Sequence, residues 1–228
     1  MMIRFASFVI LSILAGGGLV DAQQTLSVRT LSLRDVEMPQ LFLRGPKEYH
    51  SLEFSSVQPG EVMRALPANP LPLYRQETDS GGKQNWVAAQ QIRIPAGAKG
   101  ILILAIAKGD KTLFTAIDDD FISARHNDWL LINASSKPIT FLVGEKSKPV
   151  VIQPGASTKY RVSAPGGEGA TILAQAPIKG KPTVFYSTYW PVYSDRRSVI
   201  LFADNGPKIL VKRISDMLAQ TKASAVDD

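Results

Sequence analysis

Short runs of β-branched and aromatic residues, separated by glycine, proline, asparagine and serine, constrain the fold of this chain more than any other feature. The clearest series comprises residues 129–133, 139–144 and 150–152, then a Pro154-Gly155 turn and residues 160–162. Such runs are typical of antiparallel strands joined by tight connections. The sequence therefore predicts an all-β protein, an antiparallel β-sandwich of the immunoglobulin-like or jelly-roll-like kind.

The same rhythm predicts strands through most of the remaining chain. They cover residues 26–33, 41–43, 50–56, 86–94, 100–107, 112–117, 169–174, 182–190, 199–203 and 209–211. The pair Asn205-Gly206 is a strong hairpin signal between the last two strands. After them, residues 214–221 suggest a short helix.

Residues 59–80 interrupt this regular pattern. They contain Pro59, Pro67, Pro70 and Pro72 and end at a Gly81-Gly82 pair. Proline removes a backbone donor from the ladder, so a central strand is not expected here and residues 71–74 are predicted to form at most an edge strand. This stretch could be a domain boundary, but the mature residues before it are few for a stable β domain without disulfides. We therefore predict one sandwich domain over residues 23–216, followed by a polar tail, residues 217–228.

The N-terminus has the composition of a secretory signal. Arg4 precedes an apolar run over residues 5–15, and Val20-Asp21-Ala22 offers a cleavage site before Gln23. The run is too short for a comfortable membrane span, and no later stretch is apolar for the roughly 20 residues that a spanning helix needs. The sequence thus predicts a cleaved signal over residues 1–22 and an exported protein, periplasmic or extracellular, with no integral membrane span.

The composition of the 228 residues excludes several kinds of functional site. The absence of cysteine excludes disulfides, thiolate metal sites and a cysteine nucleophile. The net charge of +6 is not concentrated in a basic run. With export expected, nucleic acid is not a predicted partner, and anionic envelope polysaccharide is the better electrostatic target. No pattern indicates a cofactor or a metal, so neither is expected.

Aromatic side chains gather near residue 190 and supply the candidate binding residues. Alternation along a strand places Tyr186 and Trp190 on one face and Tyr189 on the other, so one row is expected in the core and the other could stack on sugar rings. The candidate binding residues are Tyr186, Tyr189, Trp190, Tyr193 and Arg196.

Acidic residues form a second candidate group. Asp118, Asp119 and Asp120 are consecutive, and His126 and Asp128 follow shortly. A calcium loop spaces its ligands at alternate positions around a glycine, which this run does not do, so a solvated turn is expected. No catalytic residue is predicted.

Residues 92–216 resemble an uncharacterised group of exported bacterial β-sandwich proteins. The resemblance is carried by "NDWLLINASSKPITFLVG", "VVIQPGASTKYRV" and "RRSVILFAD…KILVKRISD". It implies the sandwich fold and no activity. No strict internal repeat is visible, although "IRIPAGAKGILI" and "VVIQPGASTKYRV" each place a Pro-containing corner between two strands.

Three functions follow as hypotheses. The first is a non-enzymatic envelope protein that binds a protein partner or assembles in a complex, through loops or strand edges. The second is a carbohydrate-binding module that uses the aromatic residues near Trp190. The third is a carboxylate-dependent hydrolase, for which no pair of acids has a defined separation.

Overall fold

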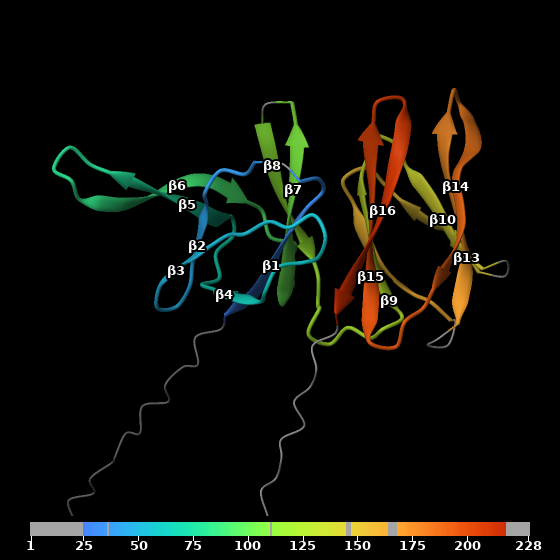
Figure 1. Ribbon diagram of the computed structural model, residues 1–228, viewed down its shortest axis with the longest axis horizontal. Coiled ribbons are helices and arrows are strands. Elements are labelled where there is room, and N and C mark those ends of the chain that lie inside the picture. The colour runs from blue at the N-terminus through green and yellow to red at the C-terminus, as the bar shows by residue number, and fades with distance from the viewer. Residues whose placement is uncertain (1–24, 36, 110, 145–146, 164–167, 218–228) are drawn as a thin grey trace, which may run out of the picture.

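The computed structural model describes residues 25–35, 37–109, 111–144, 147–163 and 168–217. These residues form sixteen strands in four four-stranded sheets (Figure 1), which confirms the all-β sandwich prediction. No helix occurs among them, so the described residues contain no helix that could cross a membrane. The predicted signal lies outside the described residues, as does the predicted tail beyond Met217.

The first sandwich is built from the first eight strands. One sheet has the order β4-β1-β7-β8 and the other the order β3-β2-β5-β6. The strands are β1 (Leu26–Ser32), β2 (Phe42–Arg44), β3 (Tyr49–Ser51), β4 (Met63–Ala65), β5 (Leu71–Thr78), β6 (Gln84–Ile92), β7 (Gly100–Lys108) and β8 (Lys111–Asp118).

The second sandwich is built from the last eight strands. Its sheets have the orders β12-β9-β15-β16 and β11-β10-β13-β14. The strands are β9 (Asp128–Ala134), β10 (Ile139–Val143), β11 (Val150–Ile152), β12 (Ser157–Arg161), β13 (Gly169–Ile178), β14 (Lys181–Pro191), β15 (Arg196–Asn205) and β16 (Lys208–Met217).

The two sandwiches repeat one topology. Each strand of the first half has a counterpart eight strands later, with the same neighbours and the same directions. The repeat includes the parallel pair β1–β7, matched by β9–β15, and a β-bulge in the β5–β6 hairpin, matched by one in β13–β14. The corner Gln58-Pro59-Gly60 matches Gln153-Pro154-Gly155. The amide of Gly60 donates to the carbonyl of Thr30, and that of Gly155 donates to the carbonyl of Asn133, each at 2.8 Å.

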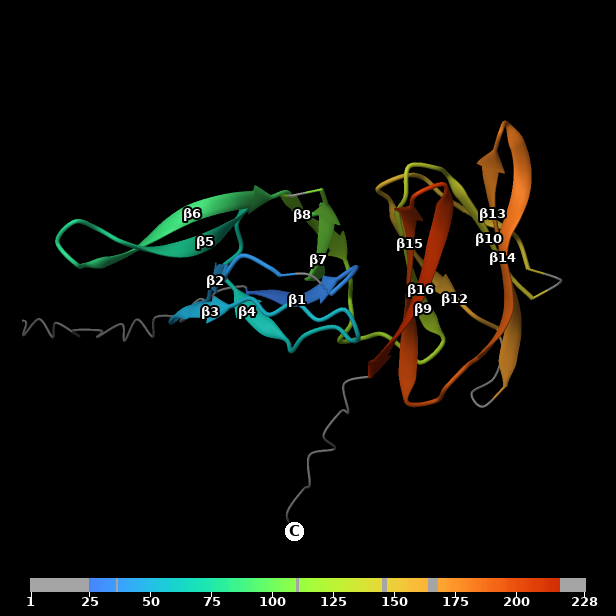
Figure 2. The same cartoon turned by 45° about the horizontal axis from the view of Figure 1, so that its top comes forward.

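The four sheets lie in four layers (Figure 2), and three apolar clusters join them. Ile101 and Leu43 belong to the core of the first sandwich, and Phe141 and Phe202 to the core of the second. The third cluster lies between the sandwiches and contains Leu102 of β7 and Leu201 of β15. Alternation along β7 and β15 explains this arrangement, because successive side chains point to opposite faces and both faces are covered.

The sheets of the two halves are separate from one another. Strands before the proline-rich stretch do complete sheets with strands after it, but only as far as Asp118, and no sheet combines strands of both halves. Whether the two sandwiches unfold as one domain stays a prediction.

Two local predictions were wrong. β5 is an inner strand despite Pro72, because its neighbour β2 pairs only with Leu73 and Tyr74 and leaves no ladder partner beside the proline on that side. Residues 214–217 continue β16 and do not begin a helix, since they pair in register with residues 196–199 of β15.

Candidate functional site

The hairpin of β5 and β6 is an arm that projects from the first sandwich, away from the second (Figures 1 and 2). Its outer part is covered on neither face. In β6 every residue is exposed except Asn85, which is half-buried, and Ile92, which is buried. Consecutive exposed residues on a strand mean that both faces contact solvent. The arm therefore offers backbone and side chains that the two cores do not use.

Aromatic rings attach the arm to the neighbouring strands β2 and β3. Trp86 stacks on Tyr49 with ring centroids 4.2 Å apart, and its edge meets Phe42 at 4.8 Å. Tyr49 also contacts Tyr74 of β5 at 5.1 Å. Such aromatic pairs stabilise the fold beyond the contribution from burying their apolar surface. Trp86 is nevertheless 36% exposed, so an apolar ring is available at the surface of the arm.

Asp79 organises the tip of the arm. Its Oδ1 accepts hydrogen bonds from the amides of Gly81 and Lys83, both at 2.9 Å, and its Oδ2 accepts one from the side chain of Asn85 at 3.1 Å. Gly82 supports the turn with a φ of +81°, which glycine adopts without steric cost. The donors around Asp79, above all the amide of Lys83 and then the side chain of Asn85, lower the pKa of its carboxyl below the ordinary value.

The lowered pKa of Asp79 predicts acid sensitivity of the tip. The carboxylate stabilises the tip above the ordinary aspartate pKa of about 3.9, and this contribution is lost as pH falls through the lower, folded-state pKa. Replacing Asn85 with alanine removes one cause, so we expect the pKa of Asp79 to rise. Carboxyl NMR titration measures both values, and an unchanged pKa in Asn85→Ala would contradict this assignment.

The outer edge of β6 carries neither charge nor proline, and its bulge, at Ala89, lies outside residues 84–88. Natural edge strands are kept short or carry charges and prolines. The structure describes eight edge strands, of which β3, β4 and β11 have three residues each, and β8, β12, β14 and β16 contain charged residues or proline. β6 has nine residues, QNWVAAQQI, with neither.

The predicted aromatic binding residues do not form one surface. Trp190 is 7% exposed and lies in the core with Tyr186, 5.7 Å away between ring centroids, whereas Tyr189 is 63% exposed on the opposite face of β14. Tyr193 is exposed and has Arg196 over its ring at 5.1 Å. Arg196 is also paired with Asp195 through two hydrogen bonds of 2.8 and 2.7 Å.

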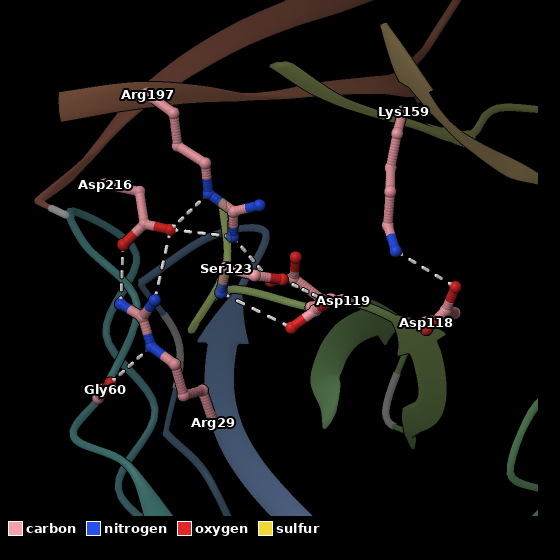
Figure 3. Close-up of polar contacts among 9 residues, drawn as sticks. Arg29, Gly60, Asp118, Asp119, Ser123, Lys159, Arg197 and Asp216 are labelled. Carbon is pink, nitrogen blue, oxygen red and sulfur yellow. Dashed lines mark hydrogen bonds and ion pairs between the residues drawn. The ribbon is translucent and has the colours of Figure 1, made fainter. Parts of the chain in front are cut away.

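A buried ionic network joins the two sandwiches (Figure 3). Arg29 of β1 donates two hydrogen bonds to Asp216 of β16, at 3.1 and 2.7 Å, and a third to the carbonyl of Gly60 at 3.0 Å. Arg197 of β15 donates from Nε to Asp216 at 2.8 Å and from Nη2 to Asp119 at 2.7 Å. The positive charges of the two arginines and the negative charges of the two aspartates thus neutralise one another where the halves meet.

The ionic network is almost completely removed from water. Asp119 and Asp216 are each 1% exposed and Arg197 is 3% exposed. Burial would lower the pKa of Arg197, but hydrogen bonds and the charges of Asp119 and Asp216 outweigh it and raise that pKa. Asp119 Oδ1 has no hydrogen-bond partner among the described residues. This arrangement fixes the two halves relative to one another.

Asp119 of the acidic run is therefore not in the solvated turn that was predicted. Asp119 is buried against Arg197, while Asp118 pairs with Lys159 of the second sandwich at 3.2 Å and Asp128 pairs with Arg161 at 2.7 Å. The hydrogen bond from Arg161 is the main cause that lowers the pKa of Asp128. Within the described ranges no three His, Cys, Asp or Glu side chains are grouped so that they could hold a metal ion.

Two hollows open on the surface of the described residues. One of about 730 Å³ lies beside β3 and has Glu48, Glu53 and Glu61 in its lining. The other, about 370 Å³, borders Arg197 of the ionic network and includes Asp128 with its partner Arg161. In the second hollow Asp128 and Arg161 are paired with one another, and Arg197 is paired with Asp119 and Asp216, so little unpaired charge faces the solvent there.

Comparison with known proteins assigns no family. No protein-family model matches the sequence, and no curated protein is significantly similar to it.

Sequence reasoning missed the arm, although a signal was present. Residues 84–92 contain no charge and are bounded by Lys83 and Arg93. A long uncharged strand is ordinary in the middle of a sheet, and only the strand order shows that this one lies at an edge.

Proposed function

We propose that this protein is a non-enzymatic, exported envelope protein that binds a protein through the outer edge of β6. One observation carries the proposal: β6 is a nine-residue edge strand without charge or proline, on an arm that projects from the body. An extended segment can add to such an edge through main-chain hydrogen bonds, and the exposed Trp86 and Val87 supply side-chain contacts.

The substitution Val87→Lys tests this proposal. Val87 is 36% exposed, so a lysine there fits without disturbing the core, and we expect the free energy of unfolding to change by no more than about 0.5 kcal/mol. A charge at a strand edge opposes pairing, so capture of the partner should fall by roughly tenfold or more. The measurement is affinity purification of the tagged protein from its native envelope after mild cross-linking.

Leu113→Lys is the matched control. Leu113 lies on the edge strand β8 and is 48% exposed, but β8 already contains charged residues. We expect this variant to capture the partner as the unchanged protein does. Equal capture by Val87→Lys and Leu113→Lys would contradict the proposal.

A second candidate, binding of an anionic polysaccharide, is favoured by the surroundings of Tyr193. The guanidinium groups of Arg196 and Arg213 lie 5.1 and 5.7 Å from the centroid of its exposed ring. Arg213 is half-buried and donates to Ser198 and to the carbonyl of Pro191. Asp195 already neutralises Arg196, which weakens the attraction of this surface for an anion. The outer edge of β6 is therefore the better-supported binding site.

A further inference from the structure

We infer that the partner strand at the β6 edge comes from a second copy of this chain, paired antiparallel about a two-fold axis at Trp86. This inference rests on the proposed use of the β6 edge and names its occupant. The paired segment is residues 84–88. It places Trp86 opposite Trp86 and Asn85 opposite Val87, so the same five residues pair on both sides.

Ladder geometry selects the outer half of β6. Tyr74 pairs with Ala88 and Leu73 with Gln90, so Ala89 is the extra residue of a bulge. A bulge disrupts a ladder and bends the strand. Residues 84–88 pair with residues 74–78 of β5 without interruption, which leaves a regular edge of five residues toward the tip.

Charge selects the same segment. In a symmetric antiparallel pair centred at Ala88, Lys83 of each copy would face Arg93 of the other, and like charges directly opposite are destabilising. Centring at Trp86 places Lys83 opposite Ala89 and opposes no two charges within the paired segment. A strand pairs with its own copy more readily when it has no charge to repel itself, and residues 84–92 have none.

Side chains leave room for this pairing. Each Trp86 ring stacks on Tyr49 of β3, at the far edge of its own sheet, so the ring lies away from the axis and leaves the backbone edge of β6 open. Because the arm projects from the body (Figures 1 and 2), antiparallel pairing carries the two bodies to opposite sides of the joined arms.

Disulfide trapping tests the register, since the chain has no cysteine of its own. Asn85→Cys and Val87→Cys proteins are prepared separately and then oxidised alone and as an equimolar mixture. Pairing about Trp86 brings position 85 of one copy opposite position 87 of the other. We therefore expect several times more covalent dimer in the mixture than in either protein alone. The matched controls are Leu113→Cys and Val184→Cys, exposed positions on the edge strands β8 and β14, which should stay monomeric.

Sedimentation of the full chain is the second measurement. We expect a concentration-dependent dimer with a dissociation constant below roughly 100 µM. Val87→Lys should raise this dissociation constant about tenfold or more. A monomer throughout that range, or equal cross-linking in the mixture and in the single proteins, would overturn the inference. If the chain is monomeric but Val87→Lys still loses a captured envelope protein, the edge binds a foreign strand, and the proposed function stands without the dimer.

Discussion

Asp216→Ala is expected to lower the free energy of unfolding by about 3–5 kcal/mol, because it leaves two buried arginines without their shared carboxylate. Asp216 accepts hydrogen bonds from both Arg29 and Arg197 and is 1% exposed. Asp119 alone cannot balance both cations. Urea denaturation followed by fluorescence and circular dichroism measures the loss.

The control for Asp216→Ala is Asp195→Ala, which removes a carboxylate from an exposed pair with Arg196. Exposed ion pairs contribute little, so this variant should unfold at nearly the same urea concentration as the unchanged protein. Because the ionic network joins the sandwiches, we also expect both halves of the unchanged protein to unfold in one transition. Two separated transitions, or a loss for Asp216→Ala no larger than for Asp195→Ala, would contradict the structural role of the network.

Trp190→Ala is also expected to lower the free energy of unfolding by about 3–5 kcal/mol, because it leaves a cavity in the core. The ring of Trp190 packs against Trp129 and Tyr186, both at 5.7 Å between centroids, and lies under the guanidinium of Arg213 at 5.3 Å. Thermal and urea unfolding measure this loss.

Tyr189→Ala separates a core role from a sugar-binding role on the same strand. Tyr189 is 63% exposed, so its removal should change the free energy of unfolding by at most about 0.5 kcal/mol. If Trp190→Ala kept its stability and lost binding to envelope glycans, Trp190 would be a sugar-binding residue and not a core residue.

Turn chemistry and alternation predicted much of the fold, because both act over a few residues. The run at residues 129–133 becomes β9, and the Asn205-Gly206 turn connects β15 to β16. The prediction for β5 failed because the cost of a proline depends on which neighbour lies beside it. Strand order fixes that neighbour, and strand order is a property of the whole chain.

The ionic network could not be predicted for a related reason. Arg29 and Asp216 are 187 residues apart in the sequence, and Arg197 and Asp119 are 78 apart. A carboxylate in an acidic run is usually solvated. Asp119 is buried because the second sandwich covers it and supplies Arg197, and no local pattern indicates that contact.

The topological repeat was hidden because its halves share little sequence. The echo between "IRIPAGAKGILI" and "VVIQPGASTKYRV" links the β6–β7 corner to the β11–β12 corner, which are not equivalent positions. The true counterpart of the second corner is Gln58-Pro59-Gly60, between β3 and β4. Equivalent backbone hydrogen bonds to Thr30 and Asn133 identify it.

The contact between the two sandwiches does not need a high intrinsic affinity. Equivalent faces of β7 and β15 meet there, so the contact has the form of a dimer interface enclosed in one chain. The nine residues between Asp118 and Asp128 hold the halves at an effective concentration on the order of millimolar. Tethering makes a weak intrinsic affinity sufficient, so this interface can retain buried charges that fix its alignment while contributing little net attraction.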